Sequence, residues 1–402
     1  MFKFKRDEKR NLESIPVGSL GMIPLQSCTE LGKKVDYYLV KWRTEREHEH
    51  RNSLAFAGYQ RDSYIIASKA PRFGSGEGKG VLQESVRGTD LYIMVDVCNY
   101  SLTYNMSGHV NHMSPDDHYQ DLKRIIAAIG GKARRITVIM PFLYESRQHK
   151  RTSRESLDCA LALQELVNMG VDNIITFDAH DPGVEHALHK TEFDNFFATN
   201  VILEEFINNL PQEELEHLAF IAPDNGAVGR RDVYLNSFNS AAIDREAGSF
   251  IKKRDYNNLV DGKYPVIEHQ YSGSSDLTGY TAIVSDDMIS SGGSMFDVME
   301  ELKKRNVKKI YLFVTYALFA NGIDKFDEYF EKGMFDGIYT TNLSYIPEEY
   351  QEKPWLHVCD CSKLLAEIIY NIHNDKSISS ILRDKSYPVK LLEKKFQTQE
   401  KK

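Results

Sequence analysis

One short segment, residues 281–294, constrains the fold and the chemistry of this chain more than any other. Residues 281–284 are apolar or β-branched and contain neither Gly nor Pro, which predicts a short buried strand. Two adjacent acids, Asp286 and Asp287, come next, and small residues then lead into a helical run. Small residues let backbone N–H groups turn inward, and the helix adds its positive N-terminus. The segment therefore predicts a cradle for one phosphate group at the carboxyl end of a strand.

The paired carboxylates limit further which class of ligand this segment could bind. Carboxylates repel a nearby phosphate, so Asp286 and Asp287 must face another group, and sugar hydroxyls or a metal ion would satisfy them. A phosphorylated sugar fits both parts of the segment. No Lys follows the glycines, which excludes a Walker loop, and the G-x-G-x-x-G pattern is missing. The alternative is an ordinary strand-to-helix turn in which Ser291 or Ser294 caps the helix.

Composition excludes several classes of protein. A chain of 402 residues is too long to fold around a single small hydrophobic core, so its length predicts two domains. The net charge of -8 argues against a general nucleic-acid binder, and no apolar run is long enough to predict a membrane span. The charged N-terminus does not resemble a secretory signal. Five scattered cysteines indicate unpaired thiols and a reducing, cytoplasmic location.

Strand and helix patterns alternate twice along the chain, over residues 60–180 and 217–345. This alternation predicts an α/β fold with two units and mainly parallel sheets. Polar clusters follow several predicted strands, which places the site along one rim of the sheets. The expected division is an added arm over residues 1–30, domains over 31–198 and 199–382, and a charged, frayed tail over 383–402.

Two of the polar clusters suggest phosphate or metal chemistry. Residues 142–154 carry four cations within eight residues and two nearby aromatics, which fits a polyphosphate and a base, although a solvated basic loop fits equally well. Asp178 and His180 follow a strand predicted over 173–177. They suit Mg²⁺ or its waters, and a structural helix cap is the alternative.

Two further segments are predicted to be loops. Residues 98–119 contain three histidines, which raise the idea of a metal site, but solvated histidines in a polar loop or insertion explain them better. Residues 250–254 include Lys252 and Arg254 and precede a turn-rich stretch. This pattern predicts a mobile loop that carries cations.

Taken together, these clusters resemble the ribose-phosphate pyrophosphokinase (phosphoribosyl pyrophosphate synthetase) family. Seven segments match family motifs such as RFSDGE, QESVRG, TMDLH, SPDAGG and DDMxDTxGT, and they keep the family's order. One short motif would be weak, but seven in order over residues 60–382 are specific. The matching segments begin at Arg72, Gln83, Pro141, Thr176, Pro223, Asp286 and Ala366.

The resemblance implies a fold, a reaction and residue roles. Family subunits have two tandem type I phosphoribosyltransferase-like domains, and they assemble as dimers or hexamers. With Mg²⁺, they transfer the pyrophosphoryl group of ATP to O1 of ribose 5-phosphate, which gives phosphoribosyl pyrophosphate (PRPP) and AMP. By position, the resemblance implies ATP contacts by Phe73, Glu77, Arg147 and Gln148, metal binding by Asp178, His180 and Asp224, ribose 5-phosphate binding by Asp286, Asp287, Ser290, Ser291, Gly292, Gly293 and Ser294, and catalysis by Lys252 and Arg254.

The chain also departs from the family pattern. Ser75, His149 and Ser290 stand where the family has acids, the N-terminal arm is long, and residues 99–119 form an insertion. We expect an active PRPP synthetase of nucleotide biosynthesis, because the matching catalytic, metal and sugar residues are retained together. A non-catalytic regulatory homologue is the alternative. A phosphoribosyltransferase is disfavoured by the ATP-loop and catalytic-loop matches and by the duplicated unit.

Overall fold

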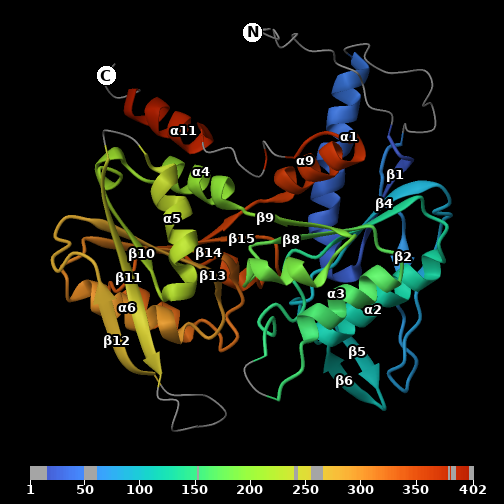
Figure 1. Cartoon of the computed structure of the whole chain (residues 1–402), viewed down its shortest axis with the longest axis horizontal. Coiled ribbons are helices and arrows are strands. Elements are labelled where there is room, and N and C mark those ends of the chain that lie inside the picture. The colour runs from blue at the N-terminus through green and yellow to red at the C-terminus, as the bar shows by residue number, and fades with distance from the viewer. Residues whose placement is uncertain are drawn as a thin grey trace, which may run out of the picture.

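Two large sheets organise the chain, with helices packed against them (Figure 1). The first has strand order β1-β4-β7-β8-β9, and the second has the order β12-β11-β10-β13-β14-β15-β16. This arrangement confirms the prediction of an α/β protein with two mainly parallel sheets. The structure, a computed structural model, describes residues 16–48, 61–151, 154–239, 243–254, 266–378, 381 and 386–397.

Every strand pair of the first sheet is parallel. All residues of β4 are buried, which is typical of a strand that helices cover on both faces. The strands are β1 (Ser19–Pro24), β4 (Thr89–Met94), β7 (Arg135–Ile139), β8 (Asn173–Phe177) and β9 (Glu192–Phe196), and the helices are α1 (Thr29–His48), α2 (Pro115–Ile129) and α3 (Asp158–Asn168).

The second sheet is parallel except for the β11–β12 pair. Its strands are β10 (His217–Ala222), β11 (Asp244–Arg254), β12 (Val266–Ser272), β13 (Thr281–Ile289), β14 (Lys309–Ala317), β15 (Gly337–Thr341) and β16 (Leu356–Cys359). Its helices include α4 (Thr199–Asn209), α5 (Val228–Ser237), α6 (Gly293–Lys303), α7 (Asp324–Glu331) and α8 (Glu348–Gln351). Two small antiparallel hairpins pair β2 (Ser68–Lys69) with β3 (Val81–Leu82) and β5 (Thr103–Met106) with β6 (His109–His112).

The expected N-terminal arm is shorter than predicted. Strand β1 pairs with β4 along its whole length, so residues 19–24 form one edge of the first sheet. Residues 1–15 lie outside the described part of the chain. The strand was missed because six residues that include Gly21 and Pro24 carry too little periodicity to be recognised without their partner.

The segment 98–119 is not the polar loop that we expected. It contains the β5–β6 hairpin and the first turn of α2. A capping box between Ser114 and Asp117 starts that helix. His118 is buried, and its Nε2 lies 2.7 Å from the carbonyl oxygen of Asn99, so it is a structural histidine.

The predicted mobile loop is also partly regular. Residues 250–254 continue strand β11 and pair with β12. The side chains of Lys252 and Arg254 lie outside the described part of the chain, as do residues 255–265.

The C-terminal tail, expected to be frayed, contains helix α11 (Ser386–Gln397). Leu392 is buried in the same apolar cluster as the inner face of α4. Lys395 donates hydrogen bonds to the carbonyl oxygens of Ile207 and Leu210, at the end of α4 where carbonyl groups lack helical partners. Helix α11 therefore covers α4 rather than extending into solvent.

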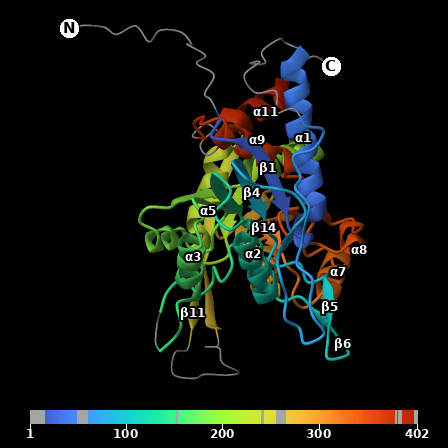
Figure 2. The ribbon, with the colours of Figure 1, turned by 90° about the vertical axis from the view of Figure 1, so that its right-hand side faces the viewer.

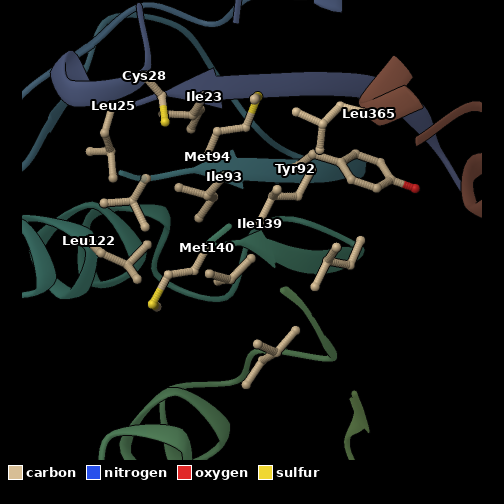
Figure 3. Close-up of a cluster of buried hydrophobic side chains, with 14 of the residues drawn as sticks. Ile23, Leu25, Cys28, Tyr92, Ile93, Met94, Leu122, Ile139, Met140 and Leu365 are labelled. Atoms are coloured by element: carbon tan, nitrogen blue, oxygen red, sulfur yellow. The ribbon is translucent and has the colours of Figure 1, made fainter. Parts of the chain in front are cut away.

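Helix α9 (Ser362–His373) belongs to the first core although it follows the second sheet in sequence. Its apolar residues join the same buried cluster as β1 and β4, and Figure 3 shows Leu365 beside Tyr92. Helix α9 also packs against α1, as both views show (Figures 1 and 2). The expected boundary at residue 199 therefore does not separate the two cores.

A buried ion-pair network fastens the end of α9 to β4. Asp90 is fully buried and accepts two hydrogen bonds from the Arg135 guanidinium, each 2.7 Å long. His373 Nδ1 lies 2.8 Å from the same carboxylate. Burial alone would raise the pKa of Asp90, but the hydrogen bonds from Arg135 and His373 lower it below its usual value.

None of the helices in the described ranges combines the length and the apolar character that crossing a bilayer requires.

We expect Asp90→Asn to destabilise the chain in a pH-dependent way. The folded-state pKa of Asp90 is depressed, so its stabilisation is complete above the unfolded pKa of about 3.9 and is lost as pH falls through the folded value. The substitution should lower the free energy of unfolding by about 1.5–3 kcal/mol at pH 7, because it removes charge-assisted hydrogen bonds from Arg135 and His373, while Arg135 keeps its contacts with Asp375 and the Ile372 carbonyl oxygen. Urea unfolding at pH 7, 5 and 3.5 measures this difference, which should shrink in acid.

The matched control is Asp375→Asn, which removes the more exposed partner of the same arginine, 3.5 Å away. It should change the unfolding free energy little. A loss for Asp90→Asn that is small, or equal at all three pH values, would contradict the assignment.

Candidate active site

The carboxyl ends of β8 and β14 meet where the two sheets join. The Tyr316 hydroxyl, near the end of β14, donates to the carbonyl oxygen of Phe177 at 2.7 Å. Thr315 donates to the carboxylate of Asp178, immediately after β8, at 2.8 Å. Since parallel sheets bind ligands beyond their carboxyl ends, this junction is the place to look for a site.

Asp178 lies at the centre of the junction. Its side chain is buried and accepts a 2.6 Å hydrogen bond from Arg230 Nε in addition to the one from Thr315. Burial raises the pKa of Asp178, and the charge of Arg230 opposes that rise. The backbone φ of Asp178 is 41°, in the left-handed region that residues other than glycine rarely adopt. Such strain is typical of functional sites, where surrounding contacts maintain it.

His180 and Asp287 link the first sheet directly to the second. His180 Nδ1 lies 2.7 Å from Asp287 Oδ2, and this contact raises the pKa of His180. Asp287 is buried, whereas the His180 side chain is 39% exposed. Arg230 Nη2 lies 3.9 Å from Asp287 Oδ2, so one guanidinium faces acids from both units.

The two adjacent acids of β13 have opposite environments. Burial, followed by repulsion from Asp287 and Asp224, raises the pKa of Asp286 well above its usual value. Burial acts on Asp287 too, but the hydrogen bond from His180 and the charge of Arg230 lower its pKa. The surroundings therefore shift the pKa values of the two neighbouring carboxyl groups in opposite directions.

The segment predicted to cradle a phosphate forms a strand, a short turn and a helix. Strand β13 runs through both acids to Ile289, five residues beyond the predicted end at 284, and α6 begins at Gly293. The positive N-terminal end of α6 lies at this loop, and Met295 N donates to the carbonyl oxygen of Gly292 at 2.9 Å. Ser291, Gly293 and Ser294 are exposed, and Ser290 is half-buried.

Gly292 is required at the N-cap of α6. Its φ is 81°, and a Cβ there would lie 2.5 Å from Cζ of Phe326. Gly293 differs, because the nearest atom to a Cβ there is Ser291 Oγ at 4.0 Å. The first glycine therefore serves the fold, whereas the second leaves the cradle open.

Arg147, His149 and Asp224 also lie near the junction. The charge of Arg147 opposes the rise in the pKa of His180. Asp224 accepts hydrogen bonds from two backbone N–H groups of its own turn, and its charge acts on Asp286. His149 Nε2 lies 3.2 Å from Asp181 Oδ2, so an acid stays beside the position where the family pattern has one.

The remaining predicted ATP residues are placed differently. Gln148 donates to the carbonyl oxygen of Ser156 at 2.8 Å, within its own loop. Phe73 and Glu77 lie on the loop of residues 72–80, and Phe73 is 54% exposed. The contacts that hold this loop go to α2 and the β5–β6 hairpin rather than to the Asp178 cluster.

Sequence reasoning missed Arg230, Thr315 and Tyr316. Arg230 follows Asp224 by six residues on the buried side of α5, and an arginine in that position was an available signal. Thr315 and Tyr316 lie in an otherwise apolar strand, where polar groups near the carboxyl end mark a site only once the facing sheet is known.

The donor set fits a magnesium ion that arrives with phosphates rather than a resident metal. Across the described residues, no group of three or more His, Cys, Asp or Glu could hold a metal ion. Both oxygens of Asp178 already accept protein hydrogen bonds, so it suits an orienting role better than the predicted ligand role. His180 and Asp224 are more accessible, and Mg²⁺ commonly takes one or two protein ligands together with substrate phosphates.

Comparison with known proteins identifies the class. Residues 20–170 match the N-terminal domain of ribose phosphate pyrophosphokinase, and residues 268–383 match the phosphoribosyl synthetase-associated domain. The ribose-phosphate pyrophosphokinase of Synechococcus elongatus is 28% identical over 315 residues, which cover 78% of this chain and 85% of that protein. The Nostoc sp. enzyme of the same name is 27% identical over 314 residues, covering 78% and 84%.

The fold agrees with these matches. The crystal structure of phosphoribosylpyrophosphate synthetase from Mycobacterium smegmatis superposes with a TM-score of 0.67 at 20% identity, covering 89% of this chain and 99% of that one. The chain belongs to the ribose-phosphate pyrophosphokinase family as a distant member.

We expect Arg230→Met to be strongly destabilising. It leaves the buried Asp178 without its counter-charge, which typically costs about 3–5 kcal/mol. The control Lys304→Met removes an exposed pair with Glu301 and should have little effect. Urea unfolding compares the two variants, and equal losses would show that Arg230 does not hold the junction.

The two glycines of the cradle should respond oppositely to alanine. Gly292→Ala should lower the free energy of unfolding by about 1–3 kcal/mol, because it forces a left-handed alanine against Phe326. Gly293→Ala should leave stability unchanged and weaken binding of ribose 5-phosphate by about tenfold or more, through lost access to the first N–H groups. Unfolding and calorimetric titration measure both, and normal binding by Gly293→Ala would contradict the cradle.

Proposed function

We propose that this chain is a ribose-phosphate diphosphokinase that transfers the pyrophosphoryl group of ATP to O1 of ribose 5-phosphate, giving PRPP and AMP for cytoplasmic nucleotide biosynthesis. The observation that carries the proposal is the convergence of an open phosphate cradle, two carboxylates and His180 at one junction of the sheets. Family membership supports the reaction class.

The ribose 5-phosphate side follows from β13 and α6. The N–H groups at the start of α6, with the hydroxyls of Ser290, Ser291 and Ser294, hold the 5-phosphate. Asp286 and Asp287 accept hydrogen bonds from the ribose hydroxyls, and the 2.7 Å contact with His180 fixes the orientation of Asp287.

The ATP side is assigned to Arg147, Gln148, Phe73 and Glu77. Arg147 lies near His180 and supplies positive charge for the polyphosphate. Mg²⁺, held by His180 and Asp224 together with the phosphates, supplies charge neutralisation of the transferred group. Lys252 and Arg254, on β11, are the proposed catalytic cations, and such transfer depends mainly on positioning and electrostatic stabilisation.

A homo-oligomer, either a dimer or a hexamer, completes the proposal. Phe73 is exposed, and its loop is held by α2 and the β5–β6 hairpin rather than at the junction. A second copy that brings this loop to the junction would provide the adenine contact. Sedimentation of the purified chain tests the assembly, and a stable monomer that makes PRPP would remove Phe73 from the site.

The alternative is a regulatory homologue without catalysis. Ser75, His149 and Ser290 replace acids of the family pattern and favour this reading. At one of these three positions the argument for lost catalysis is weaker, since the His149–Asp181 contact keeps an acid there.

Phosphorus NMR separates the two functions. The purified chain is mixed with ATP, ribose 5-phosphate, Mg²⁺ and inorganic phosphate. We expect AMP and a new pyrophosphoryl-sugar signal. A folded chain that binds ribose 5-phosphate but releases no AMP would favour the regulatory homologue.

Lys252→Ala should lower kcat by roughly 10²–10³-fold, the scale of losing one preorganised donor to the transition state. Lys252 and Arg254 match the family's K-x-R catalytic loop, in which Lys253 is the variable middle position, so Lys253→Ala is the matched control and should keep most of the activity. Steady-state rates of AMP formation compare them. An unchanged kcat for Lys252→Ala would remove this residue from the mechanism.

A further inference from the structure

In the loop of residues 72–80, Gly76, Gly78 and Gly80 are packed tightly against neighbouring groups, whereas a Cβ on Gly74 would meet nothing within 4 Å. A Cβ on Gly80 would lie 2.3 Å from the carbonyl oxygen of Arg124, and one on Gly78 would lie 2.8 Å from the Arg124 guanidinium. Arg72 anchors the start of the loop through a 2.6 Å ion pair with Asp121 on α2. One side of the loop therefore rests directly on α2.

The tip of the β5–β6 hairpin holds the other side. Ser107 N donates to the carbonyl oxygen of Gly74 at 2.8 Å. The Met106 sulfur covers Gly76 so closely that a Cβ there would lie 2.7 Å from it. At the base of the hairpin, the Tyr104 ring lies 5.2 Å from the guanidinium carbon of Arg72. The hairpin and α2 therefore hold the loop from two sides and leave Phe73 exposed.

Between these supports, the loop displays the two residues assigned to ATP. Phe73 N donates to the carbonyl oxygen of Glu77 at 2.7 Å, and Gly76 N donates to that of Phe73 at 2.9 Å, which closes a tight turn. Gly76 has a φ of 92°. Ser75 donates only a 2.9 Å side-chain hydrogen bond to Glu77. A turn with glycine at two of its five positions has large conformational freedom unless neighbouring groups restrain it.

We propose that the β5–β6 hairpin is a positioning element that holds Phe73 and Glu77 in the arrangement that binds ATP. The inference rests on the proposed function and adds a role for the segment that the sequence marks as an insertion. Met106 and Ser107 are the positioning residues, since they contact the loop and not the nucleotide. A preorganised loop binds more tightly because the cost of ordering it is met before the ligand arrives.

The test compares Met106→Ser with Val110→Ser in the full-length chain. Val110 lies on the same hairpin, is 69% exposed and pairs with Asn105 across the strands, so its variant reports general effects on the hairpin. Three quantities are measured: amide hydrogen exchange over residues 73–77, calorimetric binding of a non-hydrolysable ATP analogue, and KM for each substrate.

We expect Met106→Ser to speed exchange in the loop and to weaken binding of the ATP analogue by roughly tenfold to a hundredfold, the cost of a misplaced binding group. KM for ribose 5-phosphate should stay within about twofold, since the cradle is untouched. Val110→Ser should match the unaltered chain in all three quantities. A general structural defect would instead change both substrates and both variants together.

Three results would overturn the positioning role. They are unchanged exchange in Met106→Ser, faster exchange with unchanged binding of the ATP analogue, and equal effects of the two substitutions. An unaltered chain that forms no PRPP would contradict the proposed function instead, and analogue binding and exchange would still decide the role of the hairpin. An unaltered chain that does not bind the analogue would overturn both proposals.

Discussion

The buried ion pair between Asp178 and Arg230 is the interaction on which the relation of the two units depends. Asp178 follows β8 in the first unit, and Arg230 lies on α5 in the second, at a distance of 2.6 Å. A buried carboxylate is costly unless it is paired, so the two units must meet where this pairing is satisfied. Arg230 also faces Asp287, which in turn contacts His180. The pair thus holds Asp287 close to the first sheet.

A second buried ion-pair network lies at the opposite end of the strands of the first sheet. Asp90, Arg135 and His373 tie the end of α9 to β4 and β7, and the apolar face of α9 completes the first core (Figure 3). The chain therefore crosses from the first unit to the second and returns. The Asp178–Arg230 and Asp90–His373 contacts lie at opposite ends of the strands, and together they restrict relative rotation of the sheets more than either contact alone. Local sequence patterns could not reveal these contacts, because each joins residues more than 50 positions apart.

The structure shows what surrounds two of the residues that depart from the family pattern, His149 and Ser75. His149 faces Asp181, which returns an acid to a position beside His180. Ser75 lies in the loop of residues 72–80, and the β5–β6 hairpin contacts the backbone of this loop. The structure therefore keeps an acid beside one of the departed positions and restrains the loop that carries another.

The sequence by itself determined the elements whose patterns are local. Strand β8 occupies the predicted residues 173–177, and the strand–glycine–helix pattern of residues 281–294 yields the predicted turn. Sequence alone could not place β1, the β5–β6 hairpin or α11, because their stability comes from partners distant in the chain. Tertiary structure alone decided that Asp178 is buried against Arg230, and that Phe73 is exposed on a loop held by α2 and the β5–β6 hairpin. Local periodicity specifies which segments form helices and strands, whereas burial and charge pairing depend on which segments meet in space.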